Sequence, residues 1–441
     1  MSGQIIEDDD SENPSPVVGP SKPRILKVLG PGLITGASDD DPSGIATYAQ
    51  AGAAFGYGLA WVLLYSYPLM VAVQMISARI GRVTGHGIAG VLRLHAPPWL
   101  LQGTVVLLLL ANTFNLGADL SGMGDAAALL LPELPRWTAV LFFGTLCLSM
   151  QLVLVYTRYV AVLKWLTAAL LFYFGALAVT RIDWVQFGLD TLWPKIGGGH
   201  DVWTTLVALL GTTISPYLFF WQSAEEVEDL HAHPRRHDLL GSPEQADRAL
   251  HRIELDTIAG MAFSNGVALA VLGTAAGAFH ANGMLDIGTS AQAADALRPI
   301  AGRFASLVFT LGVIGVGLLA VPVLAGSAAY AIGEARQWPV GFSREVQEAR
   351  AFYLVVVLAT LVGMAISLTP SIDPLRALFW SAVVNGVVAV PVMVAMMRVA
   401  CRTDVMGPFA VSGLLRILGW MATSVMALTT CAMFATTIWT G

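Results

Sequence analysis

The 441-residue sequence predicts an all-α protein that crosses a membrane many times. Three observations indicate this class. Only 12% of the residues are Asp, Glu, Lys or Arg, 56% are apolar, and the apolar residues gather in runs long enough to span a bilayer. A soluble chain of this size would need more charge to cover its surface. The net charge of −6 excludes a nucleic-acid binder as a first interpretation, because such a protein presents a basic face.

The chain divides into a short tail and one long apolar domain. Residues 1–23 are polar and acidic and do not resemble a signal peptide, so we expect a disordered cytoplasmic tail ahead of a single transmembrane domain, 24–441. A spanning helix needs about 20 mostly apolar residues, and eleven segments qualify. They cover about 25–54, 57–79, 99–124, 137–156, 158–180, 202–226, 254–279, 304–333, 350–369, 375–398 and 413–438. The residues between the fifth and sixth segments are expected to form a polar loop.

The basic residues orient these segments. With the N-terminus placed inside, 18 of the 24 Lys and Arg residues fall on inner segments and 6 on outer ones. Cytoplasmic loops of membrane proteins carry this excess. The sequence therefore predicts a cytoplasmic N-terminus and an external C-terminus, in what we expect to be a bacterial inner membrane.

Helix-breaking residues interrupt the first and the sixth spans, which lie five helices apart. Gly30 to Gly32 and then Gly36 to Gly44 break the first, and Gly211 to Pro216 break the sixth. Breakers at matching positions of two halves point to a transporter binding site. An odd repeat length inverts the second copy, so we expect an inverted repeat of about 25–180 and 202–398, with 413–438 as an added helix.

Three carboxylates, Asp39, Asp40 and Asp41, lie inside the first broken span. In lipid each Asp costs about 2.5–3.5 kcal/mol at a helix centre, unless protons or a cation neutralise it. Pro42 cannot donate to the helix ladder and leaves carbonyls free. Carboxylates and free carbonyls together form an oxygen cage suited to hard divalent cations. The alternative is that the span ends near Ser38 and the Asp run is a solvated turn.

The sixth span contributes a second set of oxygens. Pro216 removes the backbone hydrogen bond to the carbonyl of Thr212, and the hydroxyls of Thr212 and Ser215 stand beside it. These groups would complete the cage as neutral ligands. The alternative is an ordinary proline kink capped by Ser and Thr, which is common in membrane helices.

The stretch from Gly30 to Gly85, GPGLITGASDDDPSGIATYAQAGAAFGYGLAW…ISARIGRVTG, resembles the Nramp divalent-metal transporters. That family has Asp-Pro-Gly-Asn in helix 1 and Met-Pro-His in helix 6. Here Asp41 and Pro42 match its metal-binding Asp-Pro. The resemblance covers about residues 25–400 and implies a LeuT-like fold and transport of a divalent metal ion. The chain looks close to the Nramp-related magnesium transporters.

Several positions depart from the family pattern. Gly44 stands at the ligand Asn, Ser215 at the Met and Tyr217 at the His, so the soft thioether and the imidazole are absent. In helix 3, Asp119 matches a proton-pathway Asp, whereas Gly122 replaces a Glu. In helix 10, Ala382 stands where a Gln approaches the metal, and Asn385 follows one turn later. These changes favour a hard, oxygen-coordinated ion such as Mg²⁺ or Mn²⁺, and weak or absent proton coupling.

The sequence thus predicts a secondary transporter, not an enzyme, that moves divalent ions of the Mn²⁺, Mg²⁺ or Fe²⁺ class. Its expected partners are the bilayer, the ion and protons. We expect neither a resident cofactor nor a nucleic-acid partner. The alternatives are a cation-coupled solute symporter of the same fold and an intramembrane metal sensor or enzyme. The expected metal ligands are Asp41, Asp40, Ser38, Thr212 and Ser215. Around them we expect Gly44, Asp39, Tyr217, Pro42, Pro216 and Asn385, with Asp119 and Asn115 on a proton or ion pathway.

Overall fold

The computed structural model describes residues 35–36, 38–153, 170–195, 200–233, 235–287, 290–295 and 305–440. Helices supply all the regular secondary structure of these residues. Nine helical segments among them are long and apolar enough to cross a membrane. The predicted class, an all-α polytopic membrane protein, is confirmed.

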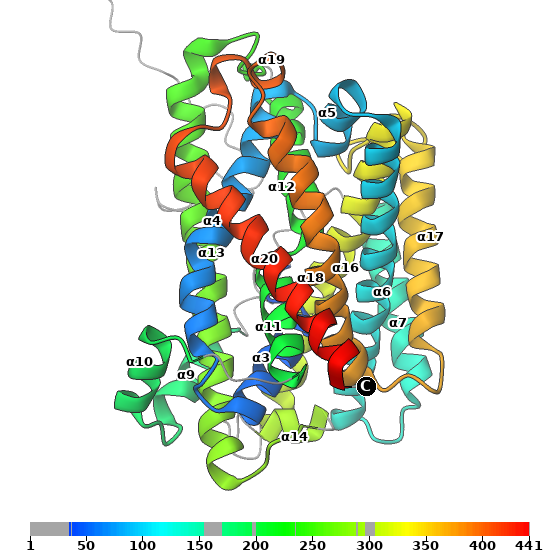
Figure 1. The fold of residues 1–441 in the computed structure, drawn as a ribbon. Coiled ribbons are helices and arrows are strands. Elements are labelled where there is room, and N and C mark those ends of the chain that lie inside the picture. The colour runs from blue at the N-terminus through cyan, green and yellow to red at the C-terminus, as the bar shows by residue number, and fades with distance from the viewer. Residues whose placement is uncertain are drawn as a thin grey trace, which may run out of the picture.

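The larger helices form one bundle whose two ends are easily told apart (Figure 1). The helices are α3 (Pro42–Phe55), α4 (Ala60–Thr84), α5 (Ile88–His95), α6 (Pro98–Leu130), α7 (Arg136–Val153), α9 (Leu171–Val179), α10 (Trp184–Leu192), α11 (His200–Thr213), α12 (Pro216–Ala232), α13 (Ala246–Ala278), α14 (Ser290–Asp295), α16 (Ala305–Arg336), α17 (Arg350–Ser367), α18 (Pro374–Ala400), α19 (Thr403–Met406) and α20 (Gly413–Thr440). We call the end with α5 and α19 the α5 end, and the end with α10 and α14 the α14 end.

Two of the eleven expected spans have no described helix of membrane length, because much of each lies outside the described residues. Of the segment 25–54 the structure shows α3 and the few residues before it, and of 158–180 it shows α9. The tail expected at 1–23 also lies outside. The count of eleven therefore stays a prediction, whereas the other nine segments each coincide with a described membrane-length helix or, for 202–226, with the pair α11 and α12.

Two short helices occupy connections in which the sequence analysis placed no helix. α10 lies in the expected polar loop and begins at a capping residue, because the Asp183 carboxylate accepts a hydrogen bond from the backbone N–H of Gln186 at 3.0 Å. α5 lies between α4 and α6. The Glu334 carboxylate, near the C-terminal end of α16, accepts hydrogen bonds from backbone N–H groups at the start of α5. The distances are 2.9 Å from Gly87, just before the helix, and 3.0 Å from Gly90.

α6 packs along α16, α17 and α18. α3 packs on α13 and α18, and α12 packs on α4. α20 slants across the outside of the bundle (Figure 1) and exposes apolar side chains that suit a lipid surface. These exposed side chains include Leu414, Ile417, Leu428 and Ile438.

The predicted helix breaks are confirmed at Asp41 and at Ser215, where they share one local design, whereas the expected interruption at Gly30 to Gly32 lies outside the described residues. Asp41 is extended (φ −63°, ψ 170°) and α3 begins at Pro42, whereas Ser215 is extended (φ −83°, ψ 132°) and α12 begins at Pro216. Proline disfavours the helical conformation in the residue before it and suits the first helical position. Each Pro therefore ends one helical segment and starts the next.

Candidate metal site at the two helix breaks

Asp41 lies at the centre of the first break and is 2% exposed. Its Oδ1 accepts hydrogen bonds from the Ser43 hydroxyl and the Gly44 backbone N–H, both at 2.7 Å. The carboxylate thus caps the N-terminus of α3, where the helix dipole favours negative charge.

The other oxygen of Asp41 faces two further helices. Asn115 on α6 donates an amide hydrogen bond to Asp41 Oδ2 at 3.0 Å. The Tyr217 hydroxyl, on the first turn of α12, lies 3.4 Å from the same oxygen and 3.0 Å from the Ser38 carbonyl. The structure therefore brings the two breaks and the middle of α6 together around one carboxylate.

Asp119 lies one turn beyond Asn115 on α6 and is fully buried. Its carboxylate is close to the Ser43 backbone N–H and to Asp41. Neither of its oxygens has a hydrogen-bond partner among the described residues. A second acidic group thus stands beside Asp41 with acceptor capacity to spare.

Asp39 and Asp40 turn away from Asp41 toward α13. The hydroxyl of Ser264 lies 2.6 Å from Asp39 Oδ2 and 3.3 Å from Asp40 Oδ1. Sequence reasoning grouped Asp40 with Asp41 as metal ligands, and the structure places their carboxylates against different helices. Both Asp39 and Asp40 are buried.

The second break contributes less free oxygen than its sequence indicates. The Ser215 hydroxyl lies 2.7 Å from the Gly211 carbonyl and 2.8 Å from the Thr212 carbonyl, so it can donate to the Thr212 carbonyl, which Pro216 leaves without a backbone donor. The Thr212 hydroxyl is bonded to the Tyr48 hydroxyl on α3 at 2.8 Å. These contacts hold the two breaks together.

Asn385 lies on α18 and is 1% exposed. Neither its amide nitrogen nor its amide oxygen has a hydrogen-bond partner among the described residues. α18 packs on α3, on α6 and on α11. The predicted residue therefore lies on a helix that adjoins both breaks.

Sequence reasoning missed three residues that organise the site: Ser43, Tyr48 and Ser264. Ser264 carried a signal, because Ser264 and Asn265 form a polar pair inside the apolar run 254–279. Tyr48 and Ser43 carried less, since a single hydroxyl near a proline break is ordinary.

Around the first break, acceptors outnumber donors. Six of the buried side-chain oxygens that have no hydrogen-bond partner in the described part of the chain belong to the first break or to α6 and α18, which pack on α3. They are Asp39 Oδ1, Asp40 Oδ2, Asn115 Oδ1, both oxygens of Asp119 and Asn385 Oδ1. Buried acceptors without donors are costly, and a cation satisfies several of them at once. Oxygen-only ligands suit Mg²⁺, Ca²⁺ and Mn²⁺.

The number of charged ligands is small. Within the described ranges, no group of three or more His, Cys, Asp or Glu side chains lies close enough together to hold a metal ion. An ion at the first break would therefore rely on amide, hydroxyl and carbonyl oxygens and on its own waters besides the carboxylates. Mg²⁺, which gives up its waters reluctantly, suits such a site.

Known proteins resemble the chain over most of its length. Residues 32–436 match the family described as natural resistance-associated macrophage protein-like, or Nramp. A protein of Burkholderia ambifaria named divalent metal cation transporter MntH is 29% identical over 412 residues, which are 91% of this chain and 87% of that protein. A protein of the same name from Acidiphilium cryptum is 28% identical over 408 residues, which are 89% of this chain and 86% of that protein.

Solved structures show the same fold. A manganese transporter of Eremococcus coleocola, bound to an aromatic bis-isothiourea compound, superposes with a TM-score of 0.70 at 17% sequence identity. The match covers 96% of this chain and 89% of the transporter's chain. At these identities the likeness concerns the fold alone, which is LeuT-like, as the sequence resemblance implies.

Proposed function

The chain belongs to the Nramp family, and on that premise we propose that it carries divalent metal ions across the membrane by alternating access. The relatives named above are called divalent metal cation transporters, which supports this class of substrate. The observation that carries the proposal is the surplus of buried oxygen acceptors around Asp41.

The ion that fits this site is hard. Asp41 is surrounded by the Ser43 hydroxyl, the Asn115 amide and the Tyr217 hydroxyl, with oxygen and nitrogen as their only polar atoms. Ser215 stands where the family has a thioether. Losing sulfur weakens the preference for soft transition metals, so we propose Mg²⁺ and Mn²⁺ as substrates and Asp41 as their central ligand.

Proton coupling is proposed to be weak or absent. Tyr217 stands where the family has His, and Gly122 where it has a Glu. A methyl group at Gly122 would lie 2.9 Å from Leu378 Cδ1, so the position is closed by an apolar side chain. Asp119 therefore has no acidic side chain one turn later on α6, at position 122, to which it could pass a proton.

The α5 end is proposed to face the cytoplasm. Arg82, Arg93 and Arg402 lie on or beside the elements at this end. Cytoplasmic loops of membrane proteins are enriched in such residues. The C-terminus, at the α14 end in Figure 1, would then face outside.

The test is metal uptake by proteoliposomes that contain the purified chain. We expect uptake of Mn²⁺ that Mg²⁺ reduces in competition, with Ca²⁺ as a third competitor. Protein-free liposomes provide the background. Absence of any Mn²⁺ or Mg²⁺ uptake by folded protein in both membrane orientations would contradict the proposed function.

A further inference from the structure

Two cavities lie between the α14 end of the bundle and the first helix break. The outer cavity, about 130 Å³, is lined by Asp286, Asp373 and Arg376 among others. These three side chains are exposed, so the outer cavity borders the solution at the α14 end. The inner cavity, about 20 Å³, reaches Pro42, which directly follows Asp41.

α3 shows how the two cavities follow each other. The helix runs from Pro42 toward the α14 end (Figure 1). Ala46 lines the inner cavity and Gln50, one turn later, lines the outer one. Leu375, in the first turn of α18, lines both cavities and is 5% exposed. Leu375 therefore lies at the boundary between them.

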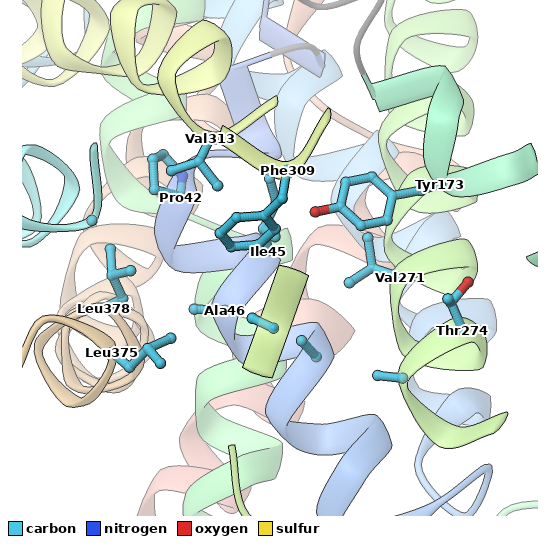
Figure 2. A pocket seen from close by; sticks show the side chains of 14 residues that line it. Pro42, Ile45, Ala46, Tyr173, Val271, Thr274, Phe309, Val313, Leu375 and Leu378 are labelled. Atoms are coloured by element: carbon cyan, nitrogen blue, oxygen red, sulfur yellow. The ribbon is translucent and has the colours of Figure 1, made fainter. Parts of the chain in front are cut away.

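The inner cavity is too small and too apolar to pass a hydrated ion. It has room for about one water molecule. Figure 2 shows Leu375 and Leu378 of α18 on one side of it and Val271 of α13 on the other, with Ile45 and Ala46 of α3 between them. Divalent ions such as Mg²⁺ give up their waters reluctantly, and apolar constrictions that exclude water block ions. The route from the α14 end to Asp41 is therefore shut in this conformation.

A buried hydroxyl indicates that the inner cavity is more than a gap in the packing. Tyr173 on α9 is 4% exposed, and its hydroxyl, which points into the cavity in Figure 2, has no hydrogen-bond partner among the described residues. Thr274, the other polar side chain that lines this cavity, donates to the Ala270 carbonyl at 2.6 Å. A buried hydroxyl without a partner favours an occupant that can form hydrogen bonds, such as water or the hydration shell of an ion.

The wall toward α6 depends on the same helix, α18. A Cβ added at Gly122 of α6 would lie 2.9 Å from Leu378 Cδ1, so Leu378 packs directly against the α6 backbone. Leu375 and Leu378 are three residues apart and lie on one face of α18. A displacement of the first turns of α18 would therefore move both leucines and join the two cavities.

We propose that the two cavities are the closed outer half of the ion's route to Asp41, and that Leu375 is the hydrophobic gate between them. The inference rests on the proposed function, because it gives the route by which the ion reaches the proposed site. The carboxylates of Asp286 and Asp373 attract cations to the outer cavity. When α18 carries Leu375 away, the cavities join and the Tyr173 hydroxyl meets the waters of the ion.

The test is the rate at which a cationic, water-soluble methanethiosulfonate reagent modifies a single cysteine in the purified full-length protein. The three native cysteines, Cys147, Cys401 and Cys431, are first replaced by alanine. Gln50→Cys then reports on the outer cavity and Ala46→Cys on the inner one. With Leu375 in place, we expect Gln50→Cys to react about tenfold faster than Ala46→Cys or more.

Removing the gate should abolish this difference. Leu375→Ala should raise the rate of Ala46→Cys about tenfold and leave the rate of Gln50→Cys unchanged. The matched control is Val392→Ala, because Val392 is buried on the same helix and lines neither cavity. It should change neither rate.

The outcomes separate the gate from the proposed function. Equal rates at positions 46 and 50 with Leu375 in place, or a rate at position 46 that Leu375→Ala does not raise, would overturn the gate. If Leu375→Ala does not fold, Leu375→Val, which removes one methylene, decides in the same direction. The rates require no metal, so a protein that shows the expected rates and takes up neither Mn²⁺ nor Mg²⁺ would contradict the proposed function alone.

Discussion

Removing Arg252 should destabilise the α5 end of the bundle strongly. The guanidinium of Arg252 on α13 lies 2.5 Å from Glu226 and 3.5 Å from Asp229, both on α12. The side chain of Glu226 is fully buried and that of Arg252 is 20% exposed. Breaking a buried ion pair by removing one partner costs about 3–5 kcal/mol, because the other charge stays buried and unpaired. We expect Arg252→Met to lower the free energy of unfolding by about 3 kcal/mol.

Arg236 provides the matched control. It lies 2.5 Å from Asp229, but its own side chain is 34% exposed, and Asp229 keeps its contacts with His233 and Arg252 when Arg236 is removed, so the pair should contribute no more than the about 0–1 kcal/mol of an exposed ion pair. Arg236→Met should therefore cost less than about 1 kcal/mol. Adding Glu226→Gln to Arg252→Met removes the stranded charge and should restore part of the lost stability.

The assay is unfolding of the purified variants by sodium dodecyl sulfate in mixed micelles, followed by tryptophan fluorescence. The reasoning predicts that Arg252→Met is clearly less stable than Arg236→Met and that Glu226→Gln partly rescues it. Equal stability of the two single variants, or a further loss in the double variant, would refute the assignment of a buried, mutually dependent pair.

Three further predictions concern packing, metal preference and coupling. Gly211→Ala should lower thermal stability and metal uptake, because the added Cβ would lie 2.1 Å from the Ala382 carbonyl oxygen on α18. Gly312→Ala is the control and should be neutral, since its added Cβ would have no atom within 4 Å. Equal melting temperatures of the two variants would contradict the close approach of α11 and α18 at Gly211. Ser215→Met should shift competition for uptake toward Cd²⁺, and an unchanged preference would mean that position 215 does not face the ion. Mn²⁺ uptake should not acidify the liposome lumen, and acidification in fixed proportion to Mn²⁺ would show coupling.

The fold was largely predictable because a bilayer imposes simple rules. Runs of apolar residues indicated the spanning helices, and Pro42 and Pro216 located the two breaks, since proline acts locally whatever surrounds it. α5 and α10 were missed because short helices at a membrane surface depend on caps. Gly87 and Gly90 donate to Glu334, which is distant in sequence.

The site was predictable in its position and less so in its partners. The prediction placed three site residues on three different spans, and the structure brings them into contact: Asn115 and Tyr217 both contact the carboxylate of Asp41. The direction in which neighbouring carboxylates turn is set by tertiary contacts, and no local pattern shows that Asp40 faces Ser264 while Asp41 faces Asn115. In the same way, the hydroxyl of Ser215 bonds to its own preceding turn, a choice that spacing does not reveal.

The central claim is that a divalent ion binds at the first helix break with Asp41 as a ligand. Crystals of the protein grown with Mn²⁺ test it most directly, through the anomalous scattering of manganese, with Asp41→Ala as the matched variant. We predict an anomalous peak within ligand distance of the Asp41 carboxylate, which disappears in the variant. A peak that lies away from the break, or one that persists beside residue 41 after the carboxylate is removed, would contradict the account.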